Sequence, residues 1–358
     1  MKLGKTLLAA AFGLAAAAYA AAAPLELADM GSFAAGGTVI EAKVPYDPYH
    51  PAPEGQTLHA DHAFVSYAVP AHRTGAPLVF LHGAGEFSKT WDTTPDGRDG
   101  FRNIFLKRGY PVYLVDQPRR GGAGRASVPG TVEAKPDEGF WFGQFRMGLW
   151  PNFYKGSAFP QSKEALDQFF RWMTPNTAPY DAKVNAAALA AVLEKSGRGS
   201  VLVTHSQGGG IGWLVGMMSG SLGGIVSYEP GSGFVFPEGE VPEPIENSSF
   251  FGPFKAVGVP AAEFKKLTRY PIVIYYGDFI PGERTDNPHA DYWRAAVKMA
   301  RLFADAVNRH GGDARVIELP EKGIRGNSHF PFAEVNNIQV ADELSAWLKE
   351  KKLDRAAE

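Results

Sequence analysis

Residues 201–210 read Val-Leu-Val-Thr-His-Ser-Gln-Gly-Gly-Gly, an apolar run that stops at a serine, and residues 211–218, Ile-Gly-Trp-Leu-Val-Gly-Met-Met, continue in a helix-compatible pattern. This order predicts a strand, a sharp turn with Ser206 at its apex, and a helix. A hydroxyl is a weak nucleophile at neutral pH, so a protein that uses it exposes it on such a turn, beside a base and backbone N–H donors. Gly208 is the close-approach position of the turn. Thr204 stands where the pattern G-x-S-x-G has its first glycine.

A second turn of this kind lies upstream, in residues 77–86, Pro-Leu-Val-Phe-Leu-His-Gly-Ala-Gly-Glu. A glycine turn at a strand end is ordinary by itself, but its position ahead of the serine favours an oxyanion-hole loop. Acyl transfer builds negative charge on a carbonyl oxygen, which two backbone N–H groups stabilise. We expect one donor from Gln207 and the other from Ala84 or Gly85.

The general-base candidate is His329, in the polar loop of residues 322–332, Lys-Gly-Ile-Arg-Gly-Asn-Ser-His-Phe-Pro-Phe. An imidazole that titrates near neutral pH suits proton transfer to and from a serine. The chain has nine histidines. His205 adjoins the serine and should point away from it, and His82 belongs to the oxyanion loop. His329 alone combines a late loop with a preceding strand, residues 314–320.

The order oxyanion loop, serine, acid, histidine resembles the α/β-hydrolase family over nearly all of the chain after about residue 40. In most such hydrolases the acid follows the second strand after the serine, which here gives Asp278. Glu229 ends the strand before that one, with Pro230 and Gly231 directly behind it. The chain most resembles a branch of exported bacterial serine esterases whose acid is a glutamate at this earlier position. We favour Glu229 and keep Asp278 as the alternative. The resemblance also suggests a homodimer.

The remaining segments predict an α/β fold with a mostly parallel central sheet covered by helices on both faces. Strands are expected at 37–44 and 61–69, as an early antiparallel pair, at 78–82 and 110–116, and near 201, 225, 271 and 314. Helices are expected around 98–108, 181–196, 207–218, 289–310 and 334–351. No repeat or long linker divides the chain, so residues 24–358 are expected to form one catalytic domain.

Two insertions interrupt this rhythm, at about 119–178 and 233–266. The first is predicted to be a cap over the site, because residues 139–154 carry many aromatic side chains. Such aromatics are often simple packing, but together they can cover an apolar acyl or aryl group and exclude water. The substrate-contact candidates are Trp141, Phe145 and Trp150.

Composition limits the function classes. The 358 residues are 45% hydrophobic and 21% charged, which suits one sizeable globular unit, and the net charge of −2 argues against a nucleic-acid partner. Without cysteine there is neither a disulfide framework nor a cysteine-ligated metal. The histidines show no metal-ligand spacing. We therefore expect neither a cofactor nor a metal.

Residues 1–23 have the form of a secretory signal peptide, with Lys2 and Lys5, a short apolar run and then small residues. Cleavage after Ala20, or slightly later, would release a periplasmic or extracellular protein without a stable membrane anchor. The apolar run is short for a membrane span.

The resulting hypothesis is a secreted serine carboxylic-ester hydrolase that acts on a small or aryl/apolar ester through Ser206, His329 and Glu229. The same groups can serve lactones, amides or C–C bonds, since fold and triad constrain the substrate weakly. The alternative from another class is a catalytically silent hydrolase fold that serves as a binding protein.

Overall fold

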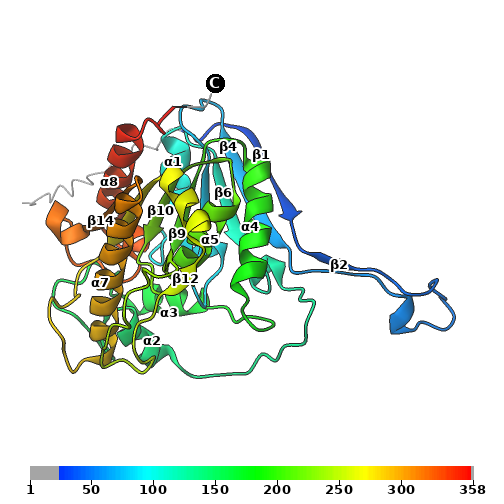
Figure 1. Ribbon diagram of the computed structural model, residues 1–358, viewed down its shortest axis with the longest axis horizontal. Coiled ribbons are helices and arrows are strands. Elements are labelled where there is room, and N and C mark those ends of the chain that lie inside the picture. The colour runs from blue at the N-terminus through cyan, green and yellow to red at the C-terminus, as the bar shows by residue number, and fades with distance from the viewer. Residues whose placement is uncertain (1–23, 356–358) are drawn as a thin grey trace, which may run out of the picture.

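The computed structural model describes residues 24–355, so the proposed signal peptide lies outside the described residues. Its centre is an eight-stranded sheet (Figure 1). In spatial order the strands are β1 (Leu27–Ala35), β4 (Ala63–Pro70), β6 (Val112–Asp116), β5 (Leu78–Leu81), β9 (Ser200–His205), β10 (Leu222–Tyr228), β13 (Pro271–Tyr276) and β14 (Asp313–Glu318). The pairs β1–β4 and β4–β6 are antiparallel, and all other pairs are parallel. The predicted mostly parallel sheet is therefore confirmed.

Both faces of the sheet are covered, which explains why the central strands are apolar without interruption. Along β9, Leu202 packs on one side, and Val201 and Val203 pack on the other. The first side carries α4 (Ala182–Ser196), α5 (Gly208–Met218) and α7 (Pro288–Arg309), and the second carries α1 (Phe101–Lys107) and α8 (Asn337–Glu350). All five helices match predicted segments.

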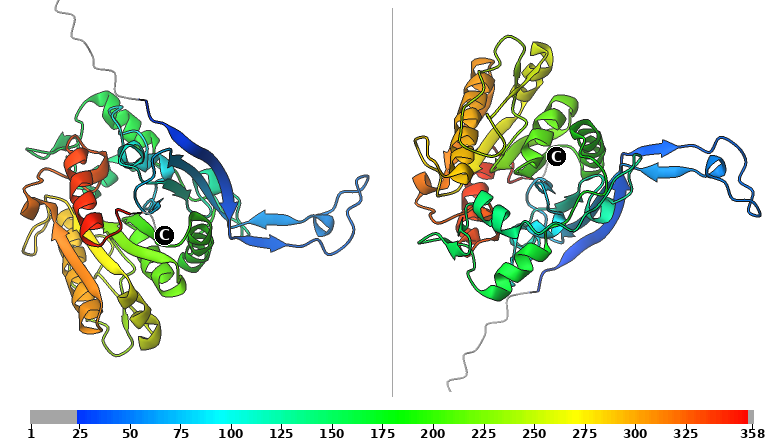
Figure 2. Two further views of the ribbon diagram at one scale, coloured as in Figure 1. Left: turned by 90° about the horizontal axis from the view of Figure 1, so that it is seen from above. Right: turned by 90° about the horizontal axis from the view of Figure 1, so that it is seen from below.

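The N-terminal region differs from the prediction. β4 pairs antiparallel with β1 and with β6, and not with residues 37–44 as predicted. β1 is an exposed edge strand with the sequence LADMGSFAA, which lacks apolar alternation and so gave no strand signal. Part of the predicted strand, β2 (Thr38–Ile40), pairs instead with β3 (Leu58–Ala60) at the base of an arm that projects from the body (Figure 2).

The two insertions contain short elements. The first carries α2 (Glu138–Gln144), the small hairpin β7 (Gly148–Leu149) and β8 (Asn152–Phe153), and α3 (Lys163–Arg171). The second carries the pair β11 (Val235–Pro237) and β12 (Val257–Val259), followed by α6 (Ala261–Phe264). Within residues 24–355, no helix has both the length and the apolar character needed to cross a membrane.

Candidate active site

Ser206 sits on a strained turn between β9 and α5. Its φ of +52° is left-handed, a conformation that costs a non-glycine residue of order 1–3 kcal/mol and persists where surrounding structure enforces it. Its N–H donates to the carbonyl oxygen of Tyr228 at the end of the neighbouring strand, 2.9 Å away. This strained backbone places Ser206 at the edge of the sheet where the parallel strands end, which is where ligands of open α/β sheets bind.

The packing around the turn explains how Thr204 replaces the usual glycine. A Cβ on Gly208 would lie 2.8 Å from the carbonyl oxygen of His82, so Gly208 is the predicted close-approach position. Thr204 is buried and donates from its hydroxyl to Ser227 Oγ, 2.9 Å away. Its methyl group fits because Gly212 faces it, where a Cβ would come within 3.1 Å. The room that the pattern's first glycine would leave on the strand is thus supplied by Gly212 of α5.

His329 is buried, and both its backbone and its ring make contacts with other segments. Its backbone N–H donates to the carbonyl oxygen of Phe145 in the cap (2.9 Å), and the Phe145 ring stacks on the imidazole with centroids 5.4 Å apart. Nδ1 lies 3.3 Å from Glu229 Oε2, and Nε2 has no hydrogen-bond partner among the described residues. Burial, and secondarily His205, lowers the pKa of His329, while Glu229 partly opposes this. The imidazole is therefore uncharged near neutral pH.

Glu229 follows β10 and is fully buried, with a left-handed φ of +55°. Its Oε1 accepts the N–H of Gly277 and, at 2.8 Å, Nη2 of Arg146. Burial alone would raise the pKa of Glu229, but Arg146 and His329 together lower it to about 2. The carboxylate is ionised and directed at Nδ1 of the imidazole.

Asp278, the alternative acid, makes different contacts. Its Oδ1 accepts the N–H of Phe279 (2.8 Å) and its Oδ2 that of Gly326 (2.9 Å). These bonds tie the turn after β13 to the loop that carries His329. The structure thus places Glu229, rather than Asp278, against the imidazole.

Two of the three predicted oxyanion donors line the cavity of Ser206. Ala84 and Gln207 line the same cavity as Ser206, and neither backbone N–H is engaged by another backbone group in the described chain. Gly85 does not line the cavity; its carbonyl oxygen accepts the N–H of Thr174 (2.9 Å), which ties the loop to the end of the first insertion.

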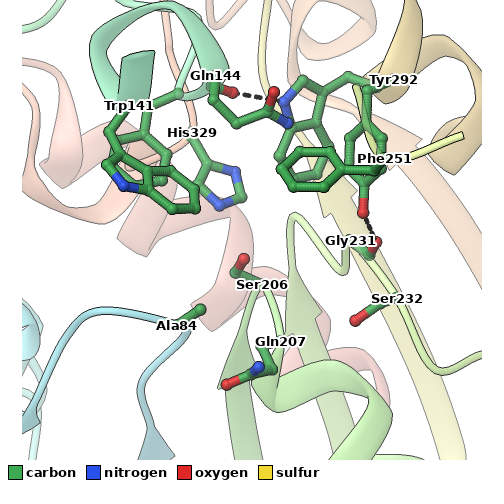
Figure 3. A pocket seen from close by; sticks show the side chains of 12 residues that line it. Ala84, Trp141, Gln144, Ser206, Gln207, Gly231, Ser232, Phe251, Tyr292 and His329 are labelled. Carbon is green, nitrogen blue, oxygen red and sulfur yellow. Dashed lines mark hydrogen bonds between the residues drawn. The ribbon is translucent and has the colours of Figure 1, made fainter. Parts of the chain in front are cut away.

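Ser206 faces the imidazole across the cavity (Figure 3). No hydrogen bond joins Ser206 Oγ to His329 in residues 24–355. A serine side chain re-aims its hydroxyl by rotation about a single bond between staggered positions, and catalytic hydrogen bonds commonly tighten only when substrate is bound.

Two known proteins are similar to this chain over most of their length. The sequence is 28% identical over 331 residues to a probable secreted lipase, phiG, of Fungal sp. (strain ATCC 74256), covering 80% of this chain and 86% of that protein. A solved structure of a bacterial esterase matches with a TM-score of 0.72 and 28% identity, over 92% of this chain and 98% of the other. No protein-family model matches. The structural match covers nearly the whole chain and agrees with the strand order and the serine turn described above. The fold is that of the α/β-hydrolases.

The cavity beside Ser206 holds about 340 Å³, within the range of small-molecule sites. Five aromatic side chains line it: Trp141, Phe145, Phe251, Tyr292 and Trp293. The polar groups are Ser206, Gln207, Gln144, Ser232 and His329. No Asp, Glu, Lys or Arg is among these lining residues of the described chain. Nor is any group of three or more His, Cys, Asp or Glu side chains within residues 24–355 arranged to hold a metal ion.

Of the three substrate-contact candidates, Trp141 and Phe145 line the cavity, and Trp150 does not. Trp150 is 50% exposed and packs edge-on against Phe142 and Phe170, on another side of the cap. The aromatic pattern of residues 139–154 led to the prediction of a cap, but it could not show which rings of α2 and the β7–β8 hairpin line the cavity.

Sequence reasoning missed Tyr292 and Trp293, which reach the cavity from the first turns of α7. The ring centroids of Trp293 and His329 lie 4.3 Å apart, and the indole N–H of Trp293 donates to the carbonyl oxygen of Gln144. A helix start was predicted near residue 289, yet a tryptophan in an amphipathic helix carries no signal that separates packing from lining. Its role depends on where the cap docks.

Proposed function

We propose that this chain is a secreted serine carboxylic-ester hydrolase in which Ser206 is the nucleophile, His329 the general base and Glu229 the acid that orients the base. The observation that supports this most is the contact of the Glu229 carboxylate with Nδ1 of His329, which leaves Nε2 in the cavity of Ser206. The two relatives add support, since one is named a probable secreted lipase and the other an esterase. Export is proposed from that name and from the leader-like residues 1–23.

In the proposed reaction, Ser206 Oγ attacks the ester carbonyl carbon while its proton passes to Nε2 of His329. The backbone N–H groups of Ala84 and Gln207 stabilise the carbonyl oxygen as it becomes negative. Glu229 stabilises the imidazolium, which then gives its proton to the departing alcohol. Water then gives a proton to Nε2 of His329 as it attacks the carbonyl carbon of the acyl-serine, and the imidazolium returns that proton to Ser206 Oγ as the acid departs. Each bond made or broken is thereby matched by one proton transfer.

The substrate class follows from the cavity lining. The cavity is lined by aromatic rings and by uncharged polar groups. This lining favours a small, uncharged acyl or aryl group. An ester with a charged acyl part would lose hydration without a compensating ion pair. We therefore propose small, neutral, apolar or aryl esters.

The test uses a fluorophosphonate, which modifies activated serines, on the chain that starts after residue 23. Intact mass should show one adduct on the wild type, and none on Ser206→Ala, whose turnover of p-nitrophenyl esters should fall on the order of 10⁵–10⁶-fold. Ser232→Ala is the matched control, because Ser232 lines the same cavity and should leave labelling intact.

An adduct that persists on Ser206→Ala would reject Ser206 as the nucleophile. Folded wild-type protein that neither forms an adduct nor hydrolyses short p-nitrophenyl esters would reject the hydrolase proposal and favour a binding protein.

A further inference from the structure

Arg146 is a fully buried arginine of the cap insertion whose guanidinium contacts the proposed triad acid. Its Nη2 donates to Glu229 Oε1 at 2.8 Å, and its Nε donates to the carbonyl oxygen of Asp278 at 3.0 Å. The guanidinium carbon lies 5.0 Å from the centre of the Trp293 ring. A buried charge is costly unless it is paired, so this arginine is held in place by the carboxylate that also serves the imidazole.

The backbone of the same segment reaches the imidazole. Phe145 stacks on the ring of His329 and accepts its backbone N–H, while Arg146 directly behind it adopts a left-handed φ of +56°. That conformation is disfavoured for arginine and is kept only where the surrounding contacts enforce it. Two consecutive residues of the first insertion therefore contact the acid–base pair: Phe145 contacts His329, and Arg146 contacts Glu229.

The charges of this cluster balance only when Arg146 is present. With Arg146 positive and Glu229 negative, a neutral His329 gives the buried group no net charge. Without Arg146 the same protonation state would leave one unpaired negative charge in the interior, which strongly favours uptake of a proton by the pair. Whether that proton goes to His329 or to Glu229, the base loses its function in the free enzyme.

Other ionisable groups around the pair do not replace Arg146. The ring centroid of His205 lies 4.4 Å from that of His329. The Nδ1 atom of His205, however, lies 3.0 Å from Glu86 Oε1. The remaining titratable groups that surround the pair are acids or phenols: Tyr276, Glu318 and Glu334, with Tyr292 on the cavity side. Arg146 is the permanently charged cation that hydrogen-bonds to Glu229 within residues 24–355.

We propose that Arg146 is a positioning residue: it docks the cap on Glu229 and balances this carboxylate, so that His329 rests as a neutral base. The inference rests on the proposed Ser206–His329–Glu229 assignment. Docking of the cap and the neutral state of His329 are then coupled, because the same arginine contacts Glu229 and balances its charge.

The test is the pH dependence of kcat/KM with a short p-nitrophenyl ester, followed for the wild type and variants of Arg146. Arg146→Gln removes the charge and should move the acid limb to higher pH by about 1–3 units, the effect of an opposite charge at this range. Arg146→Met, which keeps the aliphatic volume, is the second neutral variant. Arg146→Lys keeps the charge and should leave the limb near its wild-type position, although it loses the two-pronged contact.

The matched control is Arg119→Gln. Arg119 is also a buried arginine of the first insertion, bound through Nε and Nη2 to Asp61 at 2.8 and 3.0 Å, and is not among the residues lining the cavity. Its loss should lower the thermal midpoint without moving the acid limb. The inference is overturned if a folded neutral variant of Arg146 keeps the wild-type limb, or if Arg146→Lys moves it as far as Arg146→Gln does. Activity retained by Ser206→Ala would instead reject the underlying function.

Discussion

Glu229 and Asp278 follow neighbouring parallel strands, β10 and β13, and both make contact with the segment that carries His329. Glu229 has a left-handed backbone and sends its carboxylate to the imidazole. Asp278 keeps its carboxylate on two backbone N–H groups, those of Phe279 and Gly326. The topology brings both acids to one edge of the sheet, and the local turn decides whether the carboxylate meets a side chain that can titrate or a loop that must be held.

The largest effect should come from Glu229→Gln. We expect kcat to fall about 10⁴-fold, because an amide cannot stabilise the imidazolium and can impose the wrong tautomer. Steady-state kinetics with a p-nitrophenyl ester would measure this, with the far-ultraviolet circular dichroism spectrum as the check of folding. A kcat within tenfold of the wild type would break the contrast with Asp278.

A third carboxyl group near the same loop sharpens the comparison. Glu334 is fully buried and accepts hydrogen bonds from the backbone N–H of Ser328 (2.8 Å) and from Asn327 Nδ2 (2.7 Å), both neutral donors. Burial raises the pKa of Glu334 to about 7, whereas Glu229, with Arg146 beside it, is lowered to about 2. The two carboxyl groups are equally buried, yet their pKa values shift in opposite directions, because Glu229 has the Arg146 guanidinium beside it and Glu334 has neutral donors.

The expected pH dependence of stability follows from the raised pKa of Glu334. Its contribution is fully present below the ordinary value of 4.5 and is lost as the pH rises through about 7. Relative to Glu334→Gln, the wild type should lose on the order of 3 kcal/mol of unfolding free energy between these limits. Urea unfolding across this range would measure it. Parallel stability curves for the two proteins would contradict the shift.

The sheet and its helices could be predicted because each parallel strand is a continuous apolar run and each long helix has its own period. β9 and α4, for example, lie within a residue or two of the predicted segments. β1 was missed because an edge strand with Asp29, Gly31 and Ser32 buries little and shows no alternation. The pattern records burial, so an exposed strand leaves little trace in it.

The candidate site also contains residues that the sequence could indicate and residues that it could not. The sequence could assign Ser206 and His329 to one candidate site because each follows a recognisable strand in a glycine-containing turn, and both line the same cavity. Arg146 and Trp293 could not, since one follows a cap helix and the other lies within α7, and their roles arise only when these elements dock on Glu229 and His329. Long-range packing between segments far apart in the chain carries no local pattern.

The smallest effect should come from Asp278→Asn. The amide keeps one acceptor oxygen, but it loses the charge that strengthens the bonds from Phe279 and Gly326. We expect the free energy of unfolding to fall by about 1–3 kcal/mol while kcat stays within tenfold of the wild type, because the carboxylate makes no hydrogen bond to the imidazole. Urea unfolding and steady-state kinetics on the same preparation would separate the two effects. If Asp278→Asn lost several orders of magnitude in kcat while Glu229→Gln kept its turnover, the roles of the two acids would be the reverse of those proposed.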